Sequence, residues 1–192
     1  MRLDPETLLS AYAQGAFPMT DRDGRIRWYT ANPRGVFPLD SFHVPQTLQQ
    51  TIRQKIFEIR IDHDFEAVMR ACMAQRREHT WIGEELIRAY VALHKLGYAY
   101  SVEAWRDGEL AGGLYGVSLG AAFFGESMFH RQRDASKVAL AALVERLNQR
   151  GYELLDAQTC TEHLRRFGCV EIDEKEYLKR LRKALQKECR FN

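Results

Sequence analysis

Apolar side chains recur along the chain at two spacings, and each spacing predicts one kind of element. A repeat of three to four residues marks the buried face of a helix, whereas alternation marks a half-buried strand. The first spacing predicts helices over residues 4–15, 64–75, 84–96, 135–150, 161–167 and 173–187. The second, with short apolar runs, predicts strands over residues 57–62, 98–106, 109–117, 121–129 and 152–158.

Turn residues indicate how these strands pair. Asp107-Gly108 is a two-residue hairpin turn and residues 118–120 make a second reversal, so three consecutive strands are expected to be antiparallel. The long helix that follows permits a parallel crossover to the next strand. The expected fold class is α+β, with a mixed, largely antiparallel sheet flanked by helices.

Residues 16–45 differ from the rest because they hold four of the five prolines. Turn signals at Asp23-Gly24 and Asn32-Pro33 predict loops and short strands in this stretch. We place a boundary near Asn32-Pro33, which predicts a short N-terminal domain over residues 1–33 and a main domain over residues 34–192.

Composition narrows the class of protein. A chain of 192 residues with 45% apolar content can form a core of its own. The sequence has no apolar run of about 18 residues and no apolar signal segment at its start, so we expect a soluble, cytoplasmic protein with no membrane partner. The net charge of +2 exerts little long-range attraction on a polyanion. Any nucleic-acid partner would therefore be held by local patches.

Glu126 is the most unusual residue of the apolar segments, because a carboxylate is costly to bury without a partner. Strict alternation puts it on the face of Phe124 and Met128. A bulge at Gly125 would instead bring Phe123 and Glu126 to one cavity. Two interpretations remain open: an ion pair with an arginine at a sheet edge, or an anion at the mouth of an apolar pocket that binds an amine.

Asp156 and Gln158 stand two residues apart on a predicted strand, so their side chains leave the same face. A carboxylate in this position can orient the carboxamide and polarise a nearby N–H without a metal. The alternative is a pair of polar residues at a strand end that bond to a loop.

Cationic residues gather in three places where they could hold phosphate groups by their side chains. These are Arg131, Arg133 and Lys137 at the start of the long helix, Arg76 and Arg77 in a loop, and the helix over residues 173–187. Trp81 and Trp28 could stack on unpaired bases. A solvated basic turn and a helix that packs by one face are the alternatives.

The usual marks of several chemistries are missing from the sequence. It has no Gly-x-Ser-x-Gly elbow, no phosphate-loop motif and no His-x-x-x-His pair. Its four cysteines are irregularly spaced, which favours free thiols over a metal site. No glycine lies between Glu126 and Gly151, which disfavours a loop that cradles the pyrophosphate of coenzyme A. We expect neither a metal nor a cofactor.

A series of short motifs resembles the bacterial leucyl/phenylalanyl-tRNA–protein transferase family over nearly the whole chain. In order, the motifs are Gly15-Ala16-Phe17-Pro18, Trp28 with Asn32-Pro33-Arg34, Thr80-Trp81-Ile82, residues 112–117, Phe124-Gly125-Glu126-Ser127-Met128-Phe129, Ala135-Ser136-Lys137 and Asp156-Ala157-Gln158. The Gly-Glu-Ser-Met-Phe and Asp-x-Gln segments are the most specific of them.

The resemblance implies a fold akin to the acetyltransferase (GNAT) superfamily behind a small N-terminal domain. It also implies that leucine or phenylalanine, or methionine, passes from the 3′ end of its tRNA to the N-terminal amine of a protein that begins with Arg or Lys, which marks that protein for degradation (an N-degron pathway). Aminolysis of an ester is downhill, in agreement with the missing ATP motif.

The resemblance further implies roles for individual residues. The side chain of the amino acid would lie among Leu114, Phe123, Met128, Leu140, Leu143 and Leu155. Glu126 would face its amino group, and Trp81 would stack near the 3′ adenosine with Tyr90 and Ser127 close by. Gln158, held by Asp156, would assist proton removal from the attacking amine. The cationic residues noted above, and not the resemblance itself, supply the expected tRNA contacts, which are Arg76, Arg77, Arg131, Arg133 and Lys137.

Three positions depart from the family pattern. Met19 stands where many relatives carry a tryptophan, which affects adenine stacking from that side. Leu143 and Leu147 replace larger aromatic residues, which predicts a wider pocket or a changed preference between Leu and Phe.

Two other functions were weighed against aminoacyl transfer. A coenzyme A-dependent acetyltransferase on the same fold is opposed by the glycine-free loop before Ala135. A non-catalytic module that binds tRNA or peptide ends is opposed by the coexistence of an apolar pocket, Glu126 and the Asp156/Gln158 pair. We expect a monomer.

Overall fold

The computed structural model describes residues 3–75 and 80–192. Within them lie the helices α1 (Pro5–Ala13), α2 (Gln46–Arg53), α3 (Phe65–Gln75), α4 (Glu84–Lys95), α5 (Ala135–Gln149), α6 (Glu162–Arg165) and α7 (Glu174–Leu185), and the 3-10 turn Leu39–Ser41. The strands are β1 (Phe17–Thr20), β2 (Ile26–Tyr29), β3 (Arg34–Phe37), β4 (Glu58–Ile61), β5 (Ala99–Arg106), β6 (Glu109–Leu119), β7 (Ala122–His130), β8 (Leu154–Gln158) and β9 (Val170–Ile172).

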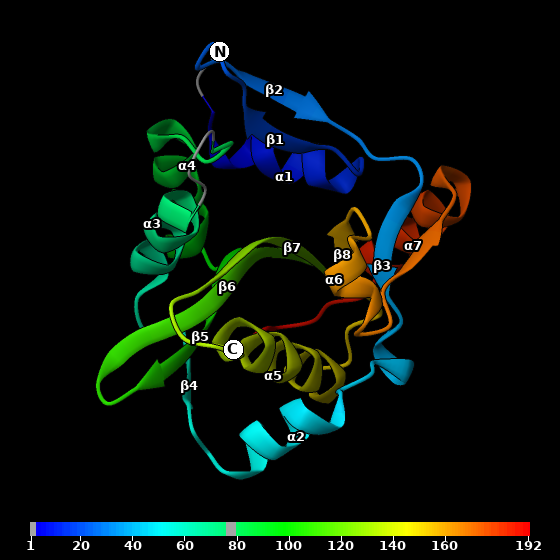
Figure 1. Ribbon diagram of the computed structural model, residues 1–192. Coiled ribbons are helices and arrows are strands. Elements are labelled where there is room, and N and C mark those ends of the chain that lie inside the picture. The colour runs from blue at the N-terminus through cyan, green and yellow to red at the C-terminus, as the bar shows by residue number, and fades with distance from the viewer. Residues whose placement is uncertain (1–2, 76–79) are drawn as a thin grey trace.

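The strands form a seven-stranded sheet in the order β4-β5-β6-β7-β8-β3-β9, and β1 and β2 form a separate hairpin (Figure 1). The strands β4 to β7 are antiparallel neighbours, as predicted, and α5 carries the chain across to β8, which runs parallel to β7. The mixed α+β class with a largely antiparallel sheet flanked by helices is thus confirmed.

Two elements outside the proline-rich stretch were not predicted from the sequence. Helix α2 begins after Pro45 without a side-chain cap, and β9 has only 3 residues, so neither gives a strong local signal. Strand β3 belongs to the proline-rich stretch that was assigned to loops and short strands. It lies between β8 and β9 in the main sheet, where all 4 of its residues are buried.

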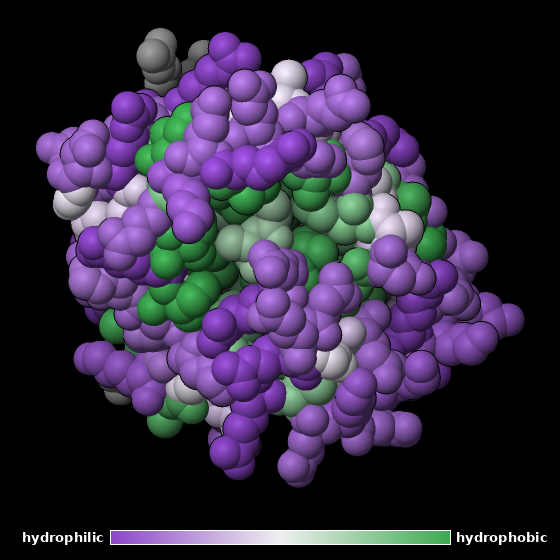
Figure 2. All heavy atoms as spheres, turned by 90° about the horizontal axis from the view of Figure 1, so that it is seen from below, coloured by the Kyte–Doolittle hydropathy of each residue, from purple (hydrophilic) through white to green (hydrophobic). Residues whose placement is uncertain are grey.

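Helices cover both faces of the sheet. Helices α1, α3, α4 and α7 pack on one face, around a core that includes Tyr12, Tyr90 and Tyr115. Helices α5 and α2 pack on the other face, around a core that includes Leu140 and Phe123. Seen from below, apolar side chains lie in a central recess framed by hydrophilic ones (Figure 2).

A bulge interrupts the pairing of β6 with β7. Tyr115 lies opposite Ser127 and the next residue, Gly116, lies opposite Gly125, so Glu126 is the extra residue on β7. Gly116 is required here, because a Cβ at this position would come within 2.3 Å of the main-chain oxygen of Phe124. The expected bulge near Gly125 is therefore confirmed.

The bulge does not have the effect that was predicted for Phe123. The ring of Phe123 is fully buried in the second core and stacks on Phe191, with 5.2 Å between ring centroids. Glu126 stays on the opposite face, where it reaches Tyr12 and Tyr90. It is Met128, beyond the bulge, that crosses to the side of the second core.

Strands β7 and β8 pair over only three positions and then diverge. Ala122, Phe123 and Phe124 lie opposite Leu154, Leu155 and Asp156. Past these positions, the carboxyl ends of two parallel strands enclose a gap, the part of a sheet where ligands commonly bind.

None of the helices in the described part of the chain has the length and apolar character needed to cross a bilayer.

Candidate active site

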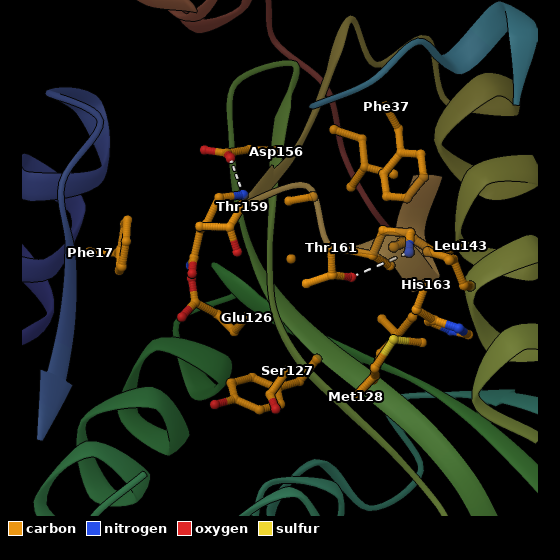
Figure 3. Close-up of a pocket in the computed structure, with 18 of the residues that line it drawn as sticks. Phe17, Phe37, Glu126, Ser127, Met128, Leu143, Asp156, Thr159, Thr161 and His163 are labelled. Atoms are coloured by element: carbon orange, nitrogen blue, oxygen red, sulfur yellow. Dashed lines mark hydrogen bonds between the residues drawn. The ribbon is translucent and has the colours of Figure 1, made fainter. Parts of the chain in front are cut away.

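A cavity of about 490 Å³ opens where β7 and β8 diverge (Figure 3). Its walls come from β6, β7, β8, α5, the loop and helix after β8, and the N-terminal hairpin. The lining residues are Phe17, Met19, Phe37, Trp81, Leu114, Tyr115, Gly125, Glu126, Ser127, Met128, Leu140, Leu143, Leu155, Asp156, Ala157, Gln158, Thr159, Thr161, His163 and Leu164.

One half of the cavity is apolar. Leu114 on β6, Met128 on β7 and Leu155 on β8 form its floor, and Leu140 and Leu143 face it from α5. All five were predicted to line one pocket, and the structure brings them together. Phe123, named with them, lies in the layer behind and is not part of the lining.

Glu126 lies in the polar half of the cavity, only 8% exposed. Its carboxylate accepts hydrogen bonds from the hydroxyl of Tyr12 (2.7 Å), the hydroxyl of Tyr90 (3.2 Å) and the carboxamide of Gln158 (3.2 Å). The two tyrosine hydroxyls also contact each other. Among the described residues, its hydrogen-bond partners are therefore neutral, and no arginine in this part of the chain forms the ion pair that was one of the two interpretations of Glu126.

Burial decides the protonation of this cluster. It raises the pKa of Glu126 to about 7, although the hydrogen bonds from Tyr12 and Tyr90 act in the opposite direction. Burial and the neighbouring carboxylate raise the pKa of both tyrosines well above their ordinary value. The two hydroxyls thus remain donors, and Glu126 can exchange its proton near neutral pH.

Asp156 is also fully buried, but its partners are of another kind. It pairs with the guanidinium of Arg34, whose Nη2 lies 2.6 Å from Oδ2 and whose Nε lies 2.9 Å from Oδ1. The hydroxyl of Tyr177 donates to Oδ2 at 2.6 Å. Asp156 reaches Gln158 through the main-chain N–H, which donates to Oδ1 at 2.8 Å, and not through the carboxamide as predicted.

Gln158 adopts a left-handed backbone conformation, with φ of 61°. This conformation costs a residue other than glycine roughly 1–2 kcal/mol. It ends β8 and leaves the carboxamide beside Glu126. The simple alternation expected from a strand therefore fails at this residue, and the two carboxylates are linked through Gln158.

Aromatic and sulfur side chains form the rim next to the N-terminal hairpin. Trp81 is 8% exposed and meets Phe17 and Met19 at the cavity wall. Phe17 is buried, and its ring lies over the guanidinium of Arg34, 5.1 Å from centroid to Cζ. Trp28, 37% exposed, lies outside this cavity on the other strand of the hairpin.

Comparison with known proteins identifies the family of this chain. The family model described as leucyl/phenylalanyl-tRNA protein transferase matches residues 36–182, and the model of its N-terminal domain matches residues 1–32. The chain belongs to this family.

Individual relatives match over almost their whole length. The leucyl/phenylalanyl-tRNA–protein transferase of Rubrobacter xylanophilus is 56% identical over 97% of this chain and 97% of its own. The one of Gloeobacter violaceus is 57% identical over 98% of this chain and 97% of its own. A solved structure of L-PGS from Bacillus licheniformis is 11% identical, with a TM-score of 0.44 over 80% of this chain and 49% of its own, a likeness too weak to argue from.

As a member of the transferase family, the protein is an aminoacyltransferase. Three of the cationic residues expected to contact tRNA, Arg131, Arg133 and Lys137, lie away from the cavity lining. Lys137 bonds to Asp134 at 2.7 Å, Arg131 donates to the carbonyl of Leu110 at 3.2 Å, and Arg133 is 93% exposed. Arg76 and Arg77 lie outside the described residues.

Three side chains that bind the two carboxylates of the candidate site were not predicted from the sequence. Tyr12 lies on α1, Arg34 on β3 and Tyr177 on α7, and each reaches a carboxylate more than twenty residues away. Spacing along the chain gives no sign of such pairs. Cys160, Cys169 and Cys189 are free thiols, and within residues 3–75 and 80–192 no cluster of side chains could hold a metal ion.

Proposed function

We propose that the protein transfers leucine, phenylalanine or methionine from aminoacyl-tRNA to the N-terminal amine of proteins that begin with Arg or Lys, and so acts in an N-degron pathway. We also propose a GNAT-like fold for residues 34–192, with residues 1–33 as a small N-terminal domain. One observation carries the functional proposal. A leucine-lined pocket opens directly onto Glu126, a buried carboxylate whose hydrogen-bond partners in the described chain are neutral.

The two halves of the cavity fit the two ends of an amino acid. The apolar half would take an aliphatic or aromatic side chain, whose burial contributes about 25 cal/mol for each Å² removed from water. Glu126 would accept hydrogen bonds from the α-amino group, and an ammonium there would stabilise its charged form. Tyr90 acts through Glu126, because it bonds to the carboxylate and is not part of the lining.

The rim next to the hairpin fits the nucleoside. Trp81 offers an aromatic face for the 3′ adenine, and Met19 and Phe17 line the same part of the cavity. Ser127 lies between this rim and the apolar floor. Arg131, Arg133 and Lys137 would meet phosphates further along the tRNA, and Arg76 and Arg77 are proposed for the same role from the sequence alone.

The reaction would be direct aminolysis of the ester. The acceptor amine attacks the ester carbonyl, the C–N bond forms, and the bond to the 3′ oxygen breaks. One proton leaves the nitrogen and the 3′ hydroxyl gains one, so no group needs to be stored on the protein. The carboxamide of Gln158 can bond to the amine or the carbonyl, but a carboxamide is no base, and positioning would supply most of the rate.

The structure adds an argument against the coenzyme A alternative. Asp134, at the start of α5, adopts a left-handed conformation with φ of 66° and is 17% exposed. Its carboxylate pairs with Lys137 Nζ at 2.7 Å, which places a negative charge at the helix end where a pyrophosphate would bind.

The test is transfer itself. Phenylalanyl-tRNA labelled in its amino acid is incubated with the protein and a substrate that begins with Arg, and a second reaction offers labelled acetyl-coenzyme A. We expect label on the N-terminus only in the first reaction. Label from acetyl-coenzyme A with none from tRNA would overturn the proposal.

A further inference from the structure

Asp156 lines the cavity, yet both of its oxygens already accept hydrogen bonds from the protein. Oδ1 accepts from Arg34 Nε at 2.9 Å and from the N–H of Gln158 at 2.8 Å. Oδ2 accepts from Arg34 Nη2 and from the Tyr177 hydroxyl, each at 2.6 Å. To take a proton from a substrate, the carboxylate would have to give up one of these bonds. Its geometry suits an anchor and not a base.

Arg34 is held as firmly as the carboxylate it pairs with. Its side chain is 1% exposed, and its Nη1 donates to the carbonyl of Gly15 at 2.9 Å. The Tyr177 ring lies 4.4 Å from Cζ on one side, and the Phe17 ring lies 5.1 Å from it. The guanidinium therefore joins the N-terminal segment, β3, β8 and α7 at a single point.

This point controls the end of β8. Among the described residues, the main-chain group that Asp156 binds is the N–H of Gln158, and Gln158 itself has a left-handed conformation. Its carboxamide reaches Glu126 at 3.2 Å. A change in the position of Asp156 would release the N–H, relax the conformation and move the carboxamide away from Glu126.

We infer that Arg34 and Tyr177 are positioning residues for aminoacyl transfer: they fix Asp156, which fixes the turn at Gln158, and the turn presents the carboxamide beside Glu126. The kinetic test of this inference rests on the proposed function. A structural test, by hydrogen exchange at Gln158, does not depend on that function.

The first test removes one hydroxyl. Tyr177→Phe keeps the ring over Arg34 but deletes a donor to Asp156. We expect kcat for transfer from phenylalanyl-tRNA to fall about tenfold, with KM for the tRNA within about twofold. Tyr152→Phe is the matched control, since it deletes a buried hydroxyl that bonds to Ser118, and it should leave both constants within about twofold. Arg34→Lys keeps the charge but loses the bidentate hydrogen bonds of the guanidinium to Asp156, and it should lower kcat further, by about 100-fold.

A double-variant cycle separates positioning from a general loss of stability. If Tyr177 acts through Gln158, then Tyr177→Phe should have no further effect on kcat once Gln158→Ala is present. An equal fall in kcat in both backgrounds would overturn the inference. So would a Tyr177→Phe enzyme with unchanged kcat, or one in which only KM rises.

The second test needs no transferase activity. Amide hydrogen exchange followed by NMR should show slow exchange at Gln158 in the parent protein and about tenfold faster exchange in Tyr177→Phe, with no change in Tyr152→Phe. Unchanged exchange at Gln158 would overturn the inference even in an active enzyme. A parent protein that transfers nothing but shows this exchange pattern would overturn the proposed function and leave the anchoring of Gln158 intact.

Discussion

The two carboxylates of the cavity are both buried, but the protein satisfies them in opposite ways. Asp156 has a cation of its own in Arg34, held in a bidentate pair. Glu126 has two tyrosine hydroxyls and a carboxamide, and burial raises its pKa to about 7. The charge of Asp156 is thus neutralised within the protein, whereas Glu126 could pair with a positively charged ligand. Burial alone does not distinguish the two carboxylates, whereas the charge of their partners does, and this difference supports the proposal that Glu126 is the one that faces the substrate.

The largest expected difference between the two is in stability. Asp156→Asn leaves the Arg34 guanidinium buried without its anion, and breaking such a pair costs about 3–5 kcal/mol. Glu126→Gln resembles the protonated acid and keeps an oxygen for the tyrosines, so at pH 4.5, where Glu126 is protonated, the free energy of unfolding should change by less than about 1 kcal/mol. Urea unfolding of both variants at pH 4.5 measures this, and equal losses would break the comparison.

The next effect is on the pH dependence of stability. The pKa of Glu126 is raised from 4.5 to about 7, so the folded protein binds more protons than the unfolded chain between these values. The stability from protonated Glu126 is therefore complete below pH 4.5 and lost as the pH rises through 7. Relative to Glu126→Gln, the free energy of unfolding should fall by about 3 kcal/mol across this window. A constant difference between the two proteins would contradict the assignment.

A somewhat smaller effect is expected on activity. Glu126→Gln loses the charge that would face the α-amino group, and kcat/KM for phenylalanyl-tRNA should fall by about 100-fold. The matched control is Glu103→Gln, a fully buried glutamate on β5 that is not part of the cavity lining and accepts hydrogen bonds from Ser101 and from the N–H of Asp64. The control should stay within about threefold of the parent. Similar losses in both variants would mean that Glu126 acts through the fold alone.

The smallest effect sharpens the comparison by changing only the apolar half of the site. Leu143→Phe fills part of the cavity and leaves both carboxylates as they are. The preference for leucine over phenylalanine, measured as the ratio of kcat/KM for the two tRNAs, should rise by about tenfold. Leu96→Phe, at a position that is 61% exposed, should leave the ratio unchanged. An unchanged ratio in Leu143→Phe would place the side-chain pocket elsewhere.

Much of the sheet could be predicted from the sequence, because its signals are local. The antiparallel strands are predicted by the Asp107-Gly108 turn and the glycines of β6. The parallel crossover is predicted by the long helix α5. The floor of the cavity was predicted in another way, because Leu114 and Leu155 were named only through the family resemblance and not through strand alternation. The bulge at Glu126 was foreseen from Gly125, but its effect on Phe123 was not, because the direction of a bulge depends on its partner strand.

The groups that complete the two carboxylates could not be found in this way. Tyr12 and Glu126 are 114 residues apart, and Arg34 and Asp156 are 122 apart. No periodicity or capping rule connects residues at such distances. The left-handed turn at Gln158 was also missed, since glutamine carries no local preference for it and only the bond to Asp156 favours it.

These long separations also bear on how the protein reaches its native state. A chain that had formed only β5 to β8 would hold Glu126 and Asp156 with neither Tyr12 nor Arg34 in place, and burying the carboxylates would then be costly. Contacts between residues so far apart form slowly, because a long loop must close first. The pocket is therefore expected to remain hydrated until the start of the chain and α7 have both docked. Catalytic competence would then be among the last properties that the folding protein acquires.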